Sequence, residues 1–181
     1  MSQVVTQRCE AITGKRWAKE PRRCKHITSK SKYCWQHLKE KTGFRIKKST
    51  VENAGLGLFT TKPIANDKKT ADYDGKKVIS HDPNYGGTYV LQVKQHPPTF
   101  VDASKTNAGL GRWMNHKPLA TANNKFVVYR GKAYMKSTKP IIPTNRKGEK
   151  ELFVPYGDDY FNHYPIKKKG VRKRKVVRKH I

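Results

Sequence analysis

The sequence is poor in acidic residues, in cysteine and in long apolar segments. Only 13 of its 181 residues are Asp or Glu, against 40 Lys or Arg, so the formal charge is +27. Apolar runs fall far short of the roughly 20 residues that a membrane-spanning helix needs. Because the start, MSQVVTQRCE, lacks an apolar stretch, we expect no secretory signal and no membrane association. The three cysteines lie too close together for a disulfide framework, which indicates a reducing compartment.

The positive charge is concentrated at the two ends of the chain. Residues 1–48 carry a net charge of +11 and residues 166–181 a net charge of +9, whereas the residues between them carry +7. The end, IKKKGVRKRKVVRKHI, repels itself and has little to bury, so we predict a disordered basic tail over 165–181. Such a tail is typical of nuclear import or of binding to nucleic-acid phosphates, although it could simply aid solubility. We therefore expect nucleic acid as a partner.

Residues 1–42 hold a cluster of side chains that commonly bind metals. Cys9, Cys24, Cys34 and His37 have the spacing CX14CX9CX2H, in which one turn can present the last two. Three thiolates and one imidazole form a closed zinc set, and this segment is too poor in apolar residues to fold without such a staple. His26 is a competing ligand, and three free thiols beside a surface histidine are the alternative. The segment resembles RC…G…RC…YCxxH modules found in proteins of large DNA viruses.

From about Gly43 onward, short β-branched and aromatic segments alternate with turn residues. These segments are FRIKKST, LGLFTTKPI, KKVIS, TYVLQV, TFVDA, KFVVYRGKAYMKS and ELFVPY. The pattern predicts a mainly β domain of many short strands over residues 43–164. We expect one short helix over SKTNAGLGRWMN, with Asp102 near its amino end.

Six motifs follow one another in this segment. They are Gly55-Leu56-Gly57, Tyr73-Asp74-Gly75, Tyr89, Val101-Asp102-Ala103, the run GRWMNH that ends at His116, and the run ELFVPYG that contains Tyr156. In this order and at these spacings they resemble the SET-domain protein lysine methyltransferases. The stretch VDASKTNAGLGRWMNH is especially similar to histone H4 lysine monomethyltransferases, and YGDDYF is similar to the ending of miniature viral SET enzymes.

The resemblance implies several short twisted sheets around a SET-type pseudoknot, in which the Asn115-His116 segment packs against the Tyr156 segment. It also implies S-adenosylmethionine as cofactor and methylation of a lysine on histone or another basic protein. The alternative is a non-catalytic SET-fold protein that binds or packages nucleic acid, which Lys117, Pro118 and the lack of a cysteine after Cys34 favour. A viral or a cellular source both stay open, so the expected location is a nucleus, a host nucleus or a virion.

The resemblance also assigns residues to the cofactor. The expected cofactor-binding residues are Gly55, Leu56, Gly57, Tyr89, Asn115, His116, Tyr160 and Phe161. The two glycines would let the backbone approach the cofactor closely, and the Asn115 amide would bind its amino-acid end. His116 would contribute its backbone near the adenine, which Tyr160 and Phe161 would cover by stacking.

Tyr156 and Tyr73 are the predicted catalytic residues. Methyl transfer to an amine needs alignment, a dry channel and a lysine without its extra proton. Burial lowers a lysine pKa, and tyrosine hydroxyls can orient the amine. The resemblance makes Val154, two residues before Tyr156, a determinant of product specificity, and its small side chain predicts that multiple methylation is possible. Arg112 is expected to be structural, as an ion-pair partner near the knot.

The charge of the chain bears on the substrate. A strongly cationic enzyme gains nothing from attracting a free cationic peptide, whereas DNA phosphates release counterions when Lys and Arg approach. We therefore expect a histone in a nucleosome, or another protein bound to nucleic acid, in preference to a free peptide.

Overall fold

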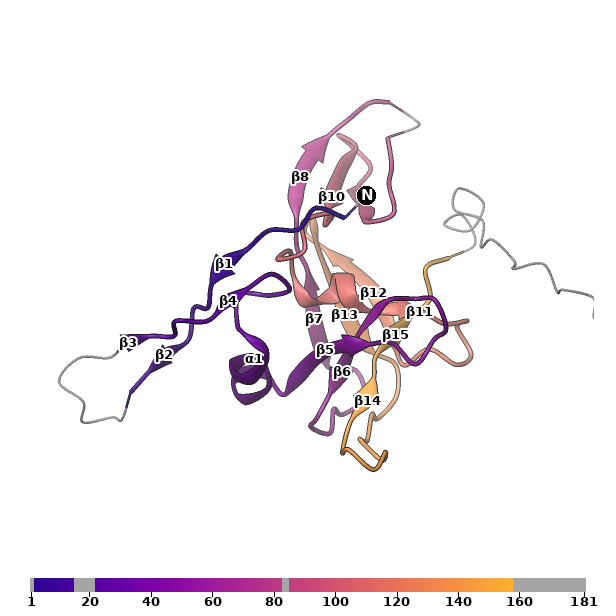
Figure 1. Ribbon diagram of the computed structural model, residues 1–181. Helices are drawn as coiled ribbons and strands as arrows, with labels where there is room; N and C mark the ends of the chain where they lie inside the picture. Colours follow the sequence, from indigo (N-terminus) through magenta and orange to yellow (C-terminus); the bar gives the residue numbers. More distant parts are fainter. Residues whose placement is uncertain (1, 15–21, 83–84, 158–181) are drawn as a thin grey trace, which may run out of the picture.

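The computed structural model describes residues 2–14, 22–82 and 85–157 and is shown in Figure 1. Tyr160, Phe161 and the predicted tail over 165–181 lie outside these residues. No helix in the described part of the chain is long and apolar enough to cross a membrane. The described residues are mainly β and form several small sheets, as the sequence predicted, and they include one short α-helix.

The amino-terminal segment forms an arm of two short antiparallel ribbons followed by a helix (Figure 1). Its elements are β1 (Gln7–Arg8), β2 (Ile12–Thr13), β3 (Arg22–Arg23), β4 (Ile27–Thr28) and α1 (Trp35–Thr42). The helix ends at Gly43, whose φ of 76° is the left-handed conformation that glycine adopts at low cost. The sequence analysis did not predict α1, because Leu38 is its only fully buried side chain and the apolar pattern is therefore weak.

The remaining strands form four small sheets. Three have three strands, in the orders β14-β6-β5, β12-β13-β7 and β8-β10-β9, and the fourth pairs β11 with β15. The bounds are β5 (Phe44–Lys48), β6 (Leu56–Thr60), β7 (Lys69–Tyr73), β8 (Lys76–Ile79), β9 (Val90–Lys94), β10 (Thr99–Asp102), β11 (Asn115–His116), β12 (Asn124–Tyr129), β13 (Lys132–Ser137), β14 (Lys150–Glu151) and β15 (Phe153–Val154).

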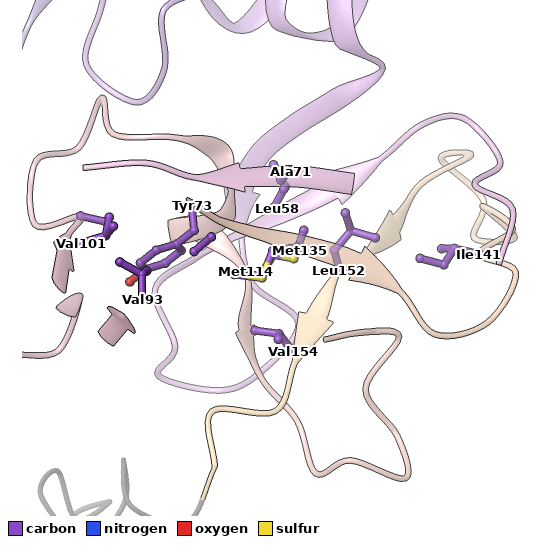
Figure 2. Close-up of a cluster of buried hydrophobic side chains, with 12 residues drawn as sticks. Leu58, Ala71, Tyr73, Val93, Val101, Met114, Met135, Ile141, Leu152 and Val154 are labelled. Carbon is purple, nitrogen blue, oxygen red and sulfur yellow. The ribbon is translucent and has the colours of Figure 1, made fainter. Parts of the chain in front are cut away.

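The sheets meet around one hydrophobic core, shown in Figure 2. Leu58, Met135, Leu152 and Val154 are completely buried there, and Met114 is 1% exposed. These side chains come from β6, β13, β15 and the segments beside them, so the core joins elements that are far apart in the sequence. Truncating one of them to alanine would cost about 2–5 kcal/mol.

Strands β11 and β15 are parallel neighbours, with Asn115 opposite Phe153 and His116 opposite Val154. This pairing brings the Asn115-His116 segment against the segment that leads to Tyr156, as the SET resemblance implied. Parallel strands need a long connection between them, and here the connection contains the β12-β13 hairpin and β14.

The helix expected over SKTNAGLGRWMN is much shorter than predicted. Only Leu110–Trp113 forms a 3₁₀ helix, η1, and the Asp102 side chain instead accepts a hydrogen bond from the Ser104 N–H at 2.8 Å. Gly109 and Gly111 pack so closely on the backbone of Asp72 that a Cβ on either would clash with it. Close packing on β7, together with the poor helix propensity of glycine, therefore limits the helix.

The amino-terminal arm packs against the segment before η1. The backbone N–H of Gln3 donates to the carbonyl of Ser104 at 2.9 Å, and the N–H of Thr106 returns a bond to Gln3 at 2.8 Å. Farther along the arm, the indole N–H of Trp113 donates to the carbonyl of Lys30 at 2.9 Å. The arm is thus attached to the mainly β part at two places, and the boundary expected at residue 42 stays a prediction.

Candidate active site and metal centre

A pocket of about 70 Å³ opens beside the β11-β15 pair. Both predicted catalytic residues, Tyr73 and Tyr156, lie in its wall, together with Tyr89. Its remaining lining residues are Thr88, Val90, Leu91, Gly111, Arg112, Met114 and Phe126. The wall is largely aromatic and aliphatic, which suits an alkyl chain better than a strongly polar ligand.

Hydrogen bonds join the backbone of Tyr156 to β11 and its hydroxyl to Met114, the residue before that strand. The phenol hydroxyl donates to the carbonyl of Met114 at 2.7 Å, and the backbone N–H donates to Nδ1 of His116 at 3.1 Å. The His116 and Tyr156 rings lie 5.5 Å apart. The position of the phenol in the pocket therefore depends on the strand pairing.

The hydrogen bond from Tyr156 requires an unprotonated Nδ1 on His116. Burial lowers the pKa of His116 below its ordinary value of 6.5, because a buried imidazole is disfavoured in its charged form. The imidazole is thus neutral at pH 7 and can act as an acceptor.

Tyr73 closes the pocket from the end of β7. Its side chain is 7% exposed, and its hydroxyl donates to the carbonyl of Tyr89 at 2.9 Å. The ring of Phe126 meets the Tyr73 ring edge-on, at 5.6 Å between centroids. An aromatic wall of this kind stabilises an alkylammonium head.

Asn115 and Gly57 are neighbours in space. The Asn115 amide nitrogen donates to the carbonyl of Leu56 at 3.0 Å and lies 3.4 Å from Oε1 of Glu151. A Cβ on Gly57 would collide with the Glu151 carboxylate and come within 3.2 Å of the Asn115 amide nitrogen. Glycine is therefore needed at position 57, because the buried Glu151 carboxylate occupies the space that a side chain would take. Glu151 is held there by hydrogen bonds from Ser49 and from the backbone of Thr50.

Several predicted residues lie away from the pocket wall. Gly55 adopts a φ of +69°, and a Cβ there would meet nothing within 4 Å, so the turn rather than a close contact requires glycine. Gly57 and Asn115 are not among the described lining residues. Val154 is completely buried in the core and does not line the pocket either, so its predicted role in product specificity stays a prediction.

Arg112 is buried, as a structural residue should be, but it makes no ion pair with any described carboxylate. Instead, Nε donates to the carbonyl of Ala103 at 2.7 Å and one terminal nitrogen donates to the Ser2 hydroxyl at 2.9 Å. The guanidinium lies over the rings of Tyr89 and Trp113, 4.3 Å from each centroid. Among the described residues, carbonyls and aromatic faces therefore contact the guanidinium, and the predicted ion pair stays a prediction.

The sequence analysis did not name Phe126 or Met114 as site residues. Met114 lies between Arg112 and Asn115, so its place in the motif was an available signal. Phe126 belongs to a strand whose pattern showed no link to the motifs, and only the β12-β13-β7 pairing brings it to Tyr73.

The predicted metal ligands come together in the arm. The ligand atoms of Cys9, Cys24, Cys34 and His37 all lie within 4.8 Å of one another; the three cysteines are buried, and the His37 side chain is 12% exposed. Sγ of Cys34 lies 3.3 Å from Nδ1 of His37, and Sγ of Cys9 lies 3.6 Å from the same nitrogen. The His26 side chain contacts Cys24, with its Nδ1 3.3 Å from that sulfur, but it is not a member of this group of four.

The thiol pKa values fit a site for a cation. Burial raises the pKa of Cys9, but hydrogen bonds from the backbone of Cys34 and Ala11 and a contact with His37 lower it to about 7. The backbone of His26 lowers the pKa of Cys24, yet burial and the charges of Cys9 and Cys34 raise it overall. Ionised together, the three thiols repel one another, and a bound metal ion removes that cost.

Comparison with known proteins supports the fold. No family model and no curated protein matches the sequence. Among solved structures, the methyltransferase domain of human PR domain-containing protein 2 matches with a TM-score of 0.53 and 24% identity, over 68% of this chain and 85% of that one. A polycomb repressive complex 2, described as active and in the stimulated state, matches with a TM-score of 0.50 and 21% identity, over 64% of this chain.

These matches define the class of the fold. The chain has the fold of a SET methyltransferase domain, which confirms at the level of fold the resemblance seen in the six motifs. It spans only 15% of the polycomb complex chain, so the similarity concerns one domain of that larger protein.

Proposed function

We propose that the chain is an S-adenosylmethionine-dependent protein-lysine N-methyltransferase. The observation that carries this proposal is the aromatic pocket of a SET fold with Tyr156 and Tyr73 in its wall. The Tyr156 hydroxyl donates to Met114 and the Tyr73 hydroxyl to Tyr89, so the two phenols are held in place before any ligand enters.

The pocket can bind a lysine side chain in a reactive state. Its apolar wall, which includes Met114, Leu91 and Phe126, excludes water from the alkyl chain. A lysine amine placed there loses hydration, which lowers its pKa. The guanidinium of Arg112, which also lines the pocket, disfavours a second positive charge. The hydroxyls of Tyr156 and Tyr73 are the polar groups that would orient the resulting neutral amine.

The residues around Asn115 fit one end of the cofactor. The Asn115 amide nitrogen is occupied by Leu56 and Glu151, whereas its oxygen accepts no hydrogen bond from the described residues. That oxygen can therefore accept a bond from an ammonium group such as the one in S-adenosylmethionine. When bound, the cofactor supplies the activated methyl group; Gly57 and His116, next to Asn115, would hold it.

For the substrate, we propose a histone in a nucleosome or another basic protein held on nucleic acid, which implies action in the nucleus. The net charge of +27 supports this choice, since it repels free cationic peptides and favours DNA phosphates. Methylation of free histone and of nucleosomes should be compared at low and moderate salt. We expect faster methylation of nucleosomes, by a margin that shrinks as the salt concentration rises. Equal rates on free histone and on nucleosomes at both salt concentrations would defeat the proposal.

The deciding experiment is incubation of core histones and nucleosomes with labelled S-adenosylmethionine, followed by mass spectrometry. Transfer of label to lysine by the wild-type chain, and its loss in Tyr156→Phe, is expected. If calorimetry shows that the cofactor does not bind and no label is transferred, the non-catalytic alternative holds. The same spectra report the degree of methylation, for which we expect products beyond monomethyl-lysine.

The Cys/His cluster is proposed as a structural zinc site. Four protein ligands complete a tetrahedral set and leave no position for a substrate. Because α1 carries His37 and begins directly after Cys34, the site would fix this helix to the β1-β4 ribbon.

A further inference from the structure

Trp35 stands exposed at the start of α1. Its side chain is 73% exposed, although an indole is large and mostly apolar and its exposure to water is unfavourable. The residue is the first of α1 and lies between Cys34 and His37, two members of the compact Cys/His cluster. A single exposed apolar residue is common, and the surroundings of Trp35 decide whether it has a role.

Two hollows border Trp35, and both are also lined by Arg45. The first lies between the arm and β5, where Ile27, Tyr33 and Ile46 contribute apolar surface. The second lies between α1 and the loop before β14. The indole is thus flanked by recesses large enough to admit flat groups, which a smooth exposed surface would not offer.

The walls of the two hollows are strongly basic. Their Lys and Arg residues are Lys30, Lys39, Arg45, Lys47, Lys62 and Lys147. Their acidic residues are Glu40 and Glu149, and Glu149 is buried and already paired with Arg45 and Lys47. Four exposed lysines remain, one on α1 and three on separate loops, and Glu40 is the one exposed acidic residue among the described lining residues, so the surroundings of Trp35 keep a net positive charge.

We propose that this surface, the Trp35 groove, binds single-stranded nucleic acid, with an unpaired base stacked on the Trp35 indole and phosphates on the surrounding lysines. Stacking on an aromatic side chain combined with a basic track is the general way in which proteins hold single strands. The inference locates a nucleic-acid contact among the described residues, and it does not depend on methyl transfer.

The combination of features favours this ligand over two others. A duplex keeps its bases stacked on one another and offers no free base face to the indole. An acidic peptide would satisfy the lysines but has no flat group for Trp35 and the recesses beside it. Both ligands are therefore outcomes that the experiment must separate from a single strand.

The test measures binding of the full chain, without S-adenosylmethionine, to an oligo(dT) of about 12 nucleotides. Indole fluorescence should be quenched on binding, and this quenching should be lost in Trp35→Phe, which still binds. Trp35→Ala should lower the affinity about tenfold. Replacing Lys39 and Lys62 by Gln should reduce the slope of log K against log salt by about 1.4.

Matched controls come from the β12-β13 hairpin. Tyr129 is 60% exposed beside Arg130 but lines none of the hollows described here, so Tyr129→Ala should leave the affinity unchanged. Lys125→Gln with Lys132→Gln matches the charge lost in the groove variant and should lower affinity less. Circular dichroism of each variant shows that it is folded.

Three results would overturn the proposal. One is equal quenching by polyphosphate or poly-glutamate, which have charge but no bases. Another is tighter binding of the same strand when it is annealed to its complement. The third is an unchanged affinity in a folded Trp35→Ala variant. Because cofactor binding is not part of the assay, these results leave the proposed methyltransferase function to its own test.

Discussion

The hydroxyl of Tyr156 donates a hydrogen bond to the main-chain carbonyl of Met114, 2.7 Å away, across the junction of β11 and β15. Met114 is 1% exposed, so this carbonyl is a buried acceptor within the core. The phenol is therefore oriented by the most deeply packed part of the fold, and Tyr156 is the residue on which the proposed chemistry depends.

We expect Tyr156→Phe to lower kcat about 10²-fold, since a small misplacement of the reacting amine has an effect of this size. The ring and its apolar contacts remain, so cofactor binding should change little. Methylation rates and calorimetry on the same preparations check both points. A variant that keeps full activity would show that the hydroxyl does not position the amine.

The His116 imidazole predicts a pH dependence. Burial lowers the pKa of His116 below 6.5 in the folded chain, while the unfolded chain keeps the ordinary value. The neutral ring therefore contributes stability that is complete above pH 6.5 and is lost as the pH falls through the folded pKa. Below that pKa, Nδ1 cannot accept the Tyr156 N–H.

Thermal unfolding followed from pH 7.5 to about 5 should show this loss of stability, and the methylation rate should fall over the same range. His116→Asn should remove the inflection in that range from both profiles. An unchanged inflection in this variant would assign the pH dependence to another group.

The metal cluster predicts different effects for two histidines. His37→Gln removes a member of the four-residue set, so it should lose bound zinc and lower the Tm. His26→Gln should keep the zinc, because His26 lies beside Cys24 and outside that set. Metal analysis of the purified variants, with unfolding before and after a chelator, checks this prediction. Zinc lost in His26→Gln and kept in His37→Gln would reverse the ligand assignment.

Gly57→Ala should destabilise the fold by about 1–3 kcal/mol, because the added methyl group overpacks against the buried Glu151. Displacement of Glu151 would also disturb Asn115, so cofactor affinity should fall. Denaturant unfolding and calorimetry measure the two effects. Stability within error of the wild type would show that Glu151 moves aside without cost.

The local features of this chain could be predicted from its sequence alone. Short alternating strands, six motifs in order and four metal-ligand residues at definite spacings were enough to predict a SET-type β fold and the Cys/His cluster. These patterns can be recognised in a sequence because turns, strand periodicity and metal-ligand spacing each depend on residues that are close together along the chain.

Which residues share the pocket, and what each one contacts, became known only from the folded chain. Phe126 reaches Tyr73 through strand pairing, Arg112 contacts carbonyls and aromatic rings, and the Glu151 carboxylate fills the space beside Gly57. The physical reason is that such contacts arise from packing between residues distant in sequence, where shape and burial outweigh local propensity. The same holds for Trp35, whose exposure among lysines from separate elements no local pattern could predict.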